Sequence, residues 1–146
     1  MRGIPKIAML FFAVVLGTAA CVASTQSKRA LIRILQQQGF TGALTGDIHF
    51  TTLGTLHCPS TDLQVIYFEW YGPVNPGSHR AQYRILFLEG GNRYLGSYLI
   101  SDRPKSISHN SILFDYDKNS GDVITCGDIG PGKSVQLDGA LPSFDK

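Results

Sequence analysis

The sequence predicts an α+β fold, in which one N-terminal helix packs on an antiparallel meander or small barrel of six to eight strands. Only residues 28–38 have the apolar spacing of an amphipathic helix. From Thr41 onward, aromatic and β-branched residues form short runs that glycine, proline, asparagine and aspartate separate. The runs follow one another at hairpin spacing. This leaves no room for the crossover helices of a parallel sheet and excludes a doubly wound fold.

The first residues of the chain are typical of an export signal. Arg2 and Lys6 carry positive charge, Ile7–Leu16 is an uninterrupted apolar run, and small residues follow at 17–20. Ten apolar residues are too few to span a bilayer, which needs about 20. We therefore expect residues 1–20 to be a signal peptide and the protein to be exported to the periplasm.

The end of this segment indicates how the chain is processed. Thr18-Ala19-Ala20-Cys21 resembles the lipobox of bacterial lipoproteins, in which small residues precede a cysteine that is lipidated and becomes the mature N-terminus. The resemblance covers four residues, and leucine is usual at the position of Thr18. It implies lipidation of Cys21 and, because Val22 and not aspartate follows, anchoring at the outer membrane. The alternative is ordinary signal-peptidase cleavage before Ser24.

Processing at this point changes the charge balance. The whole chain has 13 lysines and arginines against 11 aspartates and glutamates, and loss of Arg2 and Lys6 leaves 11 of each. A neutral chain without a run of lysine and arginine argues against a nucleic-acid partner, because such a partner needs a basic face to neutralise its phosphates. Residues 21–27 are mostly small and polar and form a predicted tether. Residues 28–146 fit a single α+β domain with one core.

The three cysteines are Cys21, Cys58 and Cys126. Lipidation or cleavage removes Cys21 from the count, and exported domains fold in oxidising compartments. The remaining pair, Cys58 and Cys126, is therefore a predicted disulfide. It would close a loop of about 69 residues, worth roughly 4 kcal/mol in the chain-entropy model. A catalytic cysteine is the alternative.

The predicted helix has a signal at each end. Ser27 provides a side-chain oxygen for its N-cap. Three apolar residues at i, i+3 and i+4 form one stripe: Leu31, Ile34 and Leu35. Gly39 suits the left-handed residue that follows a helix, and Phe40 then packs back on Leu35 in a Schellman ending.

Six strands are predicted with clear bounds: Leu44–Leu53, Leu63–Trp70, Arg80–Glu89, Arg93–Ser101, Ile112–Tyr116 and Val123–Cys126. Thr55–Cys58 continues the first strand or starts another, and Val135–Leu137 is a last short strand before an irregular tail. The 63–70 strand is apolar on both faces, so it is expected at the centre of the sheet. Gly90-Gly91-Asn92 joins the clearest hairpin, because these residues take positive φ at little cost.

Alternation assigns the side chains of that hairpin to faces. In its first arm Tyr83 shares a face with Ile85 and Phe87, and in its second arm Tyr94 shares a face with Tyr98 and Ile100. These tyrosines, and Tyr67, suit strands on propensity alone. They either fill the core or line a concave sheet, and the sequence leaves both interpretations open.

Two polar patterns share features with metal sites. The stretch Asp115-x-Asp117-x-Asn119-Ser120-Gly121 begins like a calcium loop, but it has serine at the sixth position and cysteine at the twelfth. A polar hairpin turn explains the same residues. The four histidines lack the short paired spacing of zinc ligands: His49, His57, His79 and His109. His49 and His57 would meet only if Gly54 started a hairpin. We predict neither a metal nor a cofactor.

Catalytic motifs are absent from the sequence. Neither G-x-S-x-G nor H-E-x-x-H occurs. The chain has two glutamates, Glu69 and Glu89, each at or near the end of a β run. A glycosidase pair of carboxyls would need Glu69 beside Asp47 or Asp115, and nothing in the sequence brings them together. The sequence therefore favours a protein that is not an enzyme.

Residues 70–79 are predicted to be a loop longer than a hairpin needs, stiffened by two prolines. A stiff loop loses little conformational entropy on binding. Tryptophan, tyrosine and arginine are the residue types that dominate binding hot spots. We therefore predict a partner-binding set in and around this loop: Trp70, Tyr71, His79 and Arg80. The alternative is that Trp70 ends its strand in the core and the loop is inert.

These features predict an exported, lipid-anchored bacterial binding protein. Its expected role is that of an inhibitor or immunity-type protein that caps a periplasmic enzyme, by analogy of architecture. The expected partner is a protein, and the expected membrane contact is through the lipid anchor alone. Two alternatives stay open. One is a carrier that holds a small apolar ligand, and the other is a hydrolase whose site has no recognisable motif.

Overall fold

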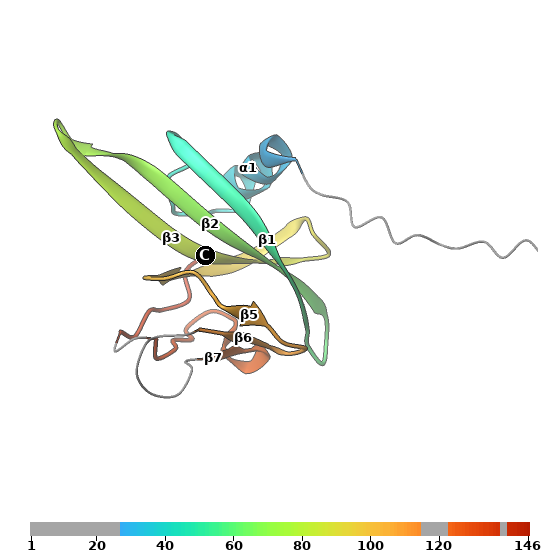
Figure 1. The fold of residues 1–146 in the computed structure, drawn as a ribbon. Coiled ribbons are helices and arrows are strands. Elements are labelled where there is room, and N and C mark those ends of the chain that lie inside the picture. Colours follow the sequence, from blue (N-terminus) through green and yellow to red (C-terminus); the bar gives the residue numbers. More distant parts are fainter. Residues whose placement is uncertain (1–26, 115–122, 138–139) are drawn as a thin grey trace, which may run out of the picture.

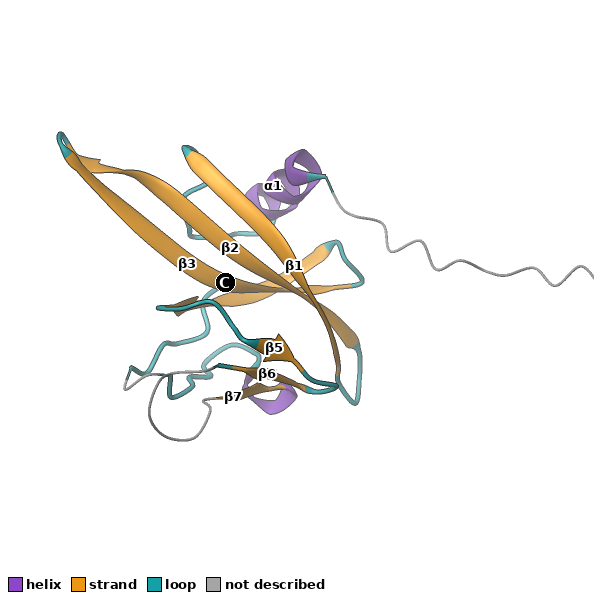
Figure 2. Cartoon of the chain, viewed as in Figure 1, coloured by secondary structure: helices purple, strands orange, loops and turns teal. Residues whose placement is uncertain are grey.

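The computed structural model describes residues 27–114, 123–137 and 140–146. In these residues one helix and two antiparallel sheets form the fold (Figure 1; Figure 2). Their bounds are α1 (Lys28–Gln37), β1 (Asp47–His57), β2 (Asp62–Asn75), β3 (Ser78–Glu89), β4 (Arg93–Ile100), β5 (Ser106–Ile107), β6 (Ser111–Leu113), β7 (Val123–Thr125) and a 3₁₀ turn η1 (Cys126–Asp128). The fold is therefore α+β. None of these described helical segments is long and apolar enough to cross a membrane.

The two sheets stay open. The larger sheet has the order β1-β2-β3-β4 and the smaller one the order β5-β6-β7. In the larger sheet β1 and β4 are the outer strands and do not pair with each other, so the barrel alternative is wrong. β2 is a central strand, as its apolar run predicted. The predicted turn at 117–121 lies outside the described residues, but β6 and β7 pair in an antiparallel manner on either side of it.

The ends of α1 follow from its sequence. The Ser27 side chain accepts a hydrogen bond from the Ala30 amide at 3.3 Å. At the other end Gly39 has φ +86°, and the Phe40 amide donates to the Leu35 carbonyl at 3.1 Å. This is the longer-range bond of a Schellman ending, which returns the chain toward the sheet.

Two β-bulges alter the predicted strands. Thr52 and Gly54 pair with consecutive residues of β2, which leaves Leu53 as an extra residue in β1. Gly54 therefore continues one strand and starts no hairpin, and His49 stays well separated from His57 along β1. A second bulge lies in β4 at Leu95. This bulge reverses the alternation of side chains in β4, so Tyr94 faces α1 while Tyr98 faces the smaller sheet. The prediction that Tyr94 and Tyr98 share a face is therefore wrong.

The larger sheet buries both of its faces. The face toward α1 forms one core cluster: Leu31, Leu35, Ile48, Ile66, Phe68, Leu86, Leu88 and Tyr94. The opposite face packs on the smaller sheet, and there Tyr83 joins Ile85 and Phe87 as predicted. The domain thus has three layers, with the helix and the smaller sheet on opposite faces of β1–β4 (Figure 2).

A disulfide ties the two sheets together. Cys58, directly after β1, is bonded to Cys126, directly after β7, with their Cα atoms 5.6 Å apart. This confirms the predicted pairing. Nearby, the His57 amide donates to the His109 carbonyl at 2.7 Å, so the same corner also has a backbone connection between the layers.

The C-terminal segment is more ordered than its composition suggests. The region 135–137 is no strand, but isolated bridges join Ser134 to Ser143 and Leu137 to Ala140. The Phe144 side chain is buried in the core. The main chain of Asp145 exchanges two hydrogen bonds with Ser97 on the outer edge of β4, at 2.7 and 2.9 Å. The predicted irregular tail therefore closes part of the sheet edge.

Candidate partner-binding surface

The predicted loop at 70–79 is two strand ends and a tight turn. β2 and β3 continue to pair through Gly72 opposite Arg80 and Pro73 opposite His79, and close at Asn75 opposite Ser78. Proline lacks an amide donor, and the register shifts next to Pro73, which leaves Val74 as an extra residue. The loop prediction is therefore wrong. The Pro-Gly pair marks only the turn, where Gly77 has φ +86°.

This hairpin projects beyond its neighbours in the sheet. β1 begins at Asp47, opposite Tyr71, and β4 ends at Ile100, opposite Tyr83. Residues 72–82, which we call the arm, therefore pair with neither β1 nor β4. Within the arm, residues 72–80 pair only with one another, and Ala81 and Gln82 pair with Tyr71 and Trp70 at its base. Figure 1 shows the arm reaching past β1 at one end of the sheet.

The arm is open to solvent. Residues 73–81 are all exposed, and the apolar Val74 side chain is 52% exposed. Arg80 provides the formal charge of the arm, and residues 72–82 include no aspartate or glutamate. Such an exposed ribbon presents backbone and side chains on both faces, with its shape set by cross-strand pairing.

The strand geometry divides the four predicted binding residues between two faces. Trp70 lies on the side of α1, where its ring packs on the core cluster and its indole N–H donates to the Thr45 carbonyl at 2.6 Å. By register, Arg80 lies on that side too, opposite Gly72. Tyr71 and His79 lie on the other side, because successive residues of a strand alternate.

Trp70 has a packing role that the sequence left open. A Cβ atom built at Gly72 would come within 2.2 Å of the Trp70 ring, so only glycine fits beneath the indole. The Trp70 side chain is half-buried and braces the base of the arm. Of the four predicted residues, Tyr71, His79 and Arg80 are the ones whose side chains are exposed.

Three tyrosine rings line the opposite side of the arm's base. Tyr67 and Tyr83 stack with ring centroids 6.1 Å apart and an interplanar angle of 12°. Tyr71 meets Tyr83 edge-on at 6.2 Å. Exposure rises along this set, from 3% at Tyr67 to 39% at Tyr71. We call these three residues and Glu69, which lies between two of them on β2, the tyrosine face.

Charged groups surround the tyrosine face. The Tyr71 hydroxyl donates to a Glu69 carboxylate oxygen at 3.4 Å. Asp47, opposite Tyr71 in the register, pairs with the ring of His49 at 3.0 Å. The guanidinium carbon of Arg103 lies 5.4 Å from the centroid of the Tyr67 ring.

These surroundings change how readily the phenols ionise. Hydrogen bonding with Tyr83, loss of hydration and the charge of Glu69 raise the pKa of Tyr71 to about 12. Burial, followed by the charge of Glu69, raises the pKa of Tyr67 above its ordinary value. The hydroxyl of Tyr71 therefore stays a neutral hydrogen-bonding group at physiological pH.

A second cluster lies at the disulfide corner. The rings of His57 and His109 stack at 4.9 Å, and Nδ1 of His57 lies 3.0 Å from Asp62. They border an open pocket of about 490 Å³ beside Cys58 and Cys126. Across the described ranges, no three histidine, cysteine, aspartate or glutamate side chains are placed to hold a metal. The Asp115–Gly121 stretch lies outside those ranges.

The sequence contained signals for this surface that its local interpretation missed. Tyr67, Glu69 and Tyr71 are spaced by two and are therefore on one side of a strand. The Pro76-Gly77 pair is also typical of a tight turn, and β2 extends to Asn75, directly before that pair. Arg103 gave no signal, because it reaches Tyr67 from a separate part of the chain after β4.

The candidate binding surface therefore consists of the arm and the tyrosine face, and the His57–His109 pair at the disulfide corner lies apart from it. Comparison with protein-family models, with curated proteins and with solved structures found no match to this chain.

Proposed function

We propose that this protein binds a protein partner through the arm and the tyrosine face, as an exported inhibitor or immunity-type protein that caps a periplasmic enzyme. The observation that carries this proposal is the arm. An isolated two-stranded hairpin is marginally stable in water, so extending β2 and β3 beyond both neighbours gains little for the fold itself. An extension of this kind is better explained by contact with another molecule.

The shape and composition of the arm suit a concave partner. A narrow ribbon that projects from a sheet fits into a cleft, and an enzyme active site is such a cleft. Cross-strand pairing fixes the ribbon before binding, so little conformational entropy is lost on association. Tyr71 and Arg80 are exposed and belong to residue types that contribute most to protein interfaces.

The surface pockets do not favour the carrier alternative. Pockets of about 490, 420 and 320 Å³ open at the disulfide corner, at the outer edge of β1 and beside the C-terminal segment. All three open to solvent, whereas a carrier encloses most of its ligand. Core side chains fill the space between the two sheets.

The proposed anchor follows from the lipobox resemblance at Cys21, which precedes the described residues. Intact mass spectrometry of the protein purified from the source bacterium tests it. A mass equal to residues 21–146 plus acyl chains is expected. A soluble species that begins at Ser24 would contradict the anchor and leave the binding function unaffected.

Partner capture followed by measured affinity tests the binding function. The mature protein is immobilised, proteins bound from periplasmic extract are identified by mass spectrometry, and the purified partner is titrated by calorimetry. Tyr71→Ala and Arg80→Ala should each weaken binding by roughly tenfold or more. Their thermal stability should change little, since both side chains are exposed and belong to neither core cluster. If the partner is an enzyme, adding the protein should lower its turnover.

Leu141→Ala is the matched control. Leu141 is an exposed apolar residue of the C-terminal segment, at 65% exposure, and belongs to neither the arm nor the tyrosine face. Its substitution should leave the affinity unchanged. Equal affinity for wild type, Tyr71→Ala and Arg80→Ala would show that the partner uses a different surface.

A further inference from the structure

We infer that the exposed end of the tyrosine face, formed by Tyr71, Tyr83 and Glu69, binds the guanidinium group of an arginine side chain on the partner. This inference rests on the proposed function and names the chemistry of the group that the partner presents. It starts from a contact within the molecule. Arg103 already places its guanidinium over Tyr67, 5.4 Å from the ring centroid. The Tyr67 end of the tyrosine face therefore already contacts a guanidinium, which is the group that we assign to the Tyr71 end.

The tyrosine face continues beyond the part that Arg103 covers. Tyr83 stacks on Tyr67 with nearly parallel rings, and Tyr71 meets Tyr83 edge-on. Tyr67 is buried, whereas Tyr83 is half-buried and Tyr71 is exposed. A second guanidinium thus has accessible aromatic surface at Tyr71 and Tyr83. A cation over an aromatic face is attracted by the quadrupole of the ring.

Glu69 supplies the carboxylate at this end. It lies between Tyr67 and Tyr71 on the same side of β2 and opposite Tyr83 on β3. A carboxylate has about four acceptor positions, so Glu69 can accept from the Tyr71 hydroxyl and from a guanidinium together. Asp47, opposite Tyr71 on β1, adds a second acid beside the imidazole of His49.

The combination of aromatic rings with a carboxylate favours arginine over lysine. A guanidinium is planar, stacks on aromatic rings and meets a carboxylate with two parallel hydrogen bonds, whereas an ammonium is a compact and strongly hydrated charge. Arg103 lies over Tyr67, at the buried end of the set, and His49, opposite Glu69 on β1, meets the Tyr71 ring edge-on with centroids 6.4 Å apart.

A small probe tests this site without the partner. Isotope-labelled, disulfide-bonded mature protein is titrated with N-acetyl-arginine methylamide and followed by NMR. Signals of Tyr71, Tyr83 and Glu69 should shift and saturate at millimolar probe. The citrulline analogue, which has the same shape without the charge, should leave them unmoved. Equal shifts with citrulline would overturn the inference. A lysine analogue that binds as tightly as arginine would overturn the guanidinium assignment.

The two glutamates of the chain provide a matched pair of variants. Glu69→Gln should weaken arginine binding by roughly fivefold or more, because it removes the charged acceptor and keeps the shape. Glu89→Gln should have no effect, since Glu89 pairs with Arg93 at the far end of β3. An unchanged affinity in Glu69→Gln would overturn the inference.

The outcomes separate this inference from the proposed function. If the arginine probe does not bind but Tyr71→Ala and Arg80→Ala still weaken partner binding, the guanidinium site is wrong and the binding function stands. If the probe binds at Glu69 but both variants keep full partner affinity, the site is real and the proposed function is wrong.

Discussion

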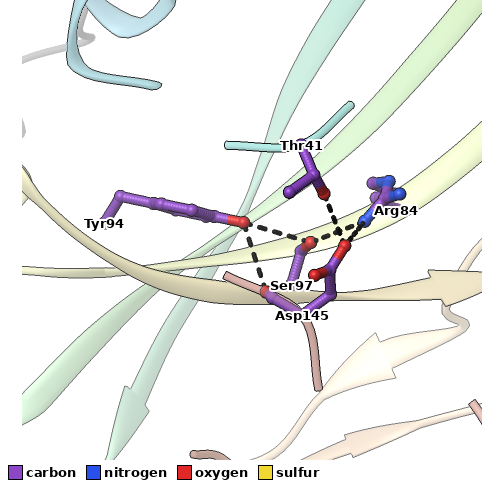
Figure 3. A network of polar contacts seen from close by, with 5 residues as sticks. All are labelled: Thr41, Arg84, Tyr94, Ser97 and Asp145. Atoms are coloured by element: carbon purple, nitrogen blue, oxygen red, sulfur yellow. Dashed lines mark hydrogen bonds and ion pairs between the residues drawn. The ribbon is translucent and has the colours of Figure 1, made fainter. Parts of the chain in front are cut away.

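The guanidinium of Arg84 donates a hydrogen bond to the carboxylate of Asp145 at 3.2 Å, and this contact joins the end of the chain to the middle of the larger sheet. Arg84 also donates to the Ser97 hydroxyl at 3.1 Å. The Asp145 carboxylate accepts a second bond, from Thr41, and the Tyr94 hydroxyl donates to Ser97 (Figure 3). The network thus links the segment after α1, two strands and the C-terminal segment.

Loss of the Asp145 carboxylate should destabilise the fold. Arg84 is only 8% exposed, and Asp145 is the acid that neutralises it in the network. Asp145→Ala would leave a nearly buried guanidinium without that partner, which costs about 2 kcal/mol of unfolding free energy. Urea denaturation measures the loss. Asp102→Ala, which removes an exposed acid at a bend, is the control and should change stability by less than about 0.5 kcal/mol.

The same carboxylate should make stability depend on acid pH. The hydrogen bond from Thr41 and the contacts with Arg84 lower the pKa of Asp145 below its ordinary value. A lowered folded-state pKa stabilises the fold above the ordinary pKa of about 3.9. The contribution is lost as the pH falls from there through the lower folded-state value. Urea denaturation between pH 6 and pH 2 should therefore show wild type converging on Asp145→Asn below about pH 3.9. A constant difference across this range would contradict the assignment.

Local signals were sufficient for several parts of this fold. The Gly90-Gly91-Asn92 turn predicted the β3–β4 hairpin, because the residues that permit positive φ are neighbours in the sequence. The disulfide followed from counting cysteines, on the expectation that the chain is exported.

The missed parts depend on contacts between distant residues. No pattern near Asp145 announces that its backbone pairs with Ser97, which is far away along the chain. The bulge at Leu95 reverses a face although the surrounding residues have ordinary strand spacing. For the arm, proline and glycine favoured a loop, and cross-strand pairing overrode that preference. The sequence left open whether Tyr67 and Tyr83 fill the core or line a concave sheet, but it did not group them with Tyr71, because strand register brings these three together.

Removal of the disulfide should weaken the connection between the two sheets. Cys58 and Cys126 are separated by 68 positions, and a loop of this size corresponds to roughly 4 kcal/mol in the chain-entropy model. Cys126→Ser and the double variant Cys58→Ser/Cys126→Ser should lose similar amounts of unfolding free energy, measured by urea denaturation. Thiol labelling of the denatured, unreduced wild type should modify neither cysteine. Labelling of both would show that the native protein lacks the bond.

Gly72→Ala should test the packing role of Trp70 separately from the binding role that we propose for the exposed Tyr71 side chain. The added methyl group would meet the Trp70 ring at 2.2 Å, so the ring must shift, and we expect its bond to the Thr45 carbonyl to be lost. Overpacking of this kind costs about 1–3 kcal/mol. Trp70 is the chain's single tryptophan, so its fluorescence emission should shift to longer wavelength as the ring becomes hydrated.

Gly127→Ala is the control for that substitution, because its added Cβ would meet no atom closer than 3.7 Å. Its emission and stability should match wild type. If Gly72→Ala leaves both the emission and the unfolding free energy unchanged, Trp70 does not brace the arm. Trp70 would then keep the binding role that the sequence alone allowed.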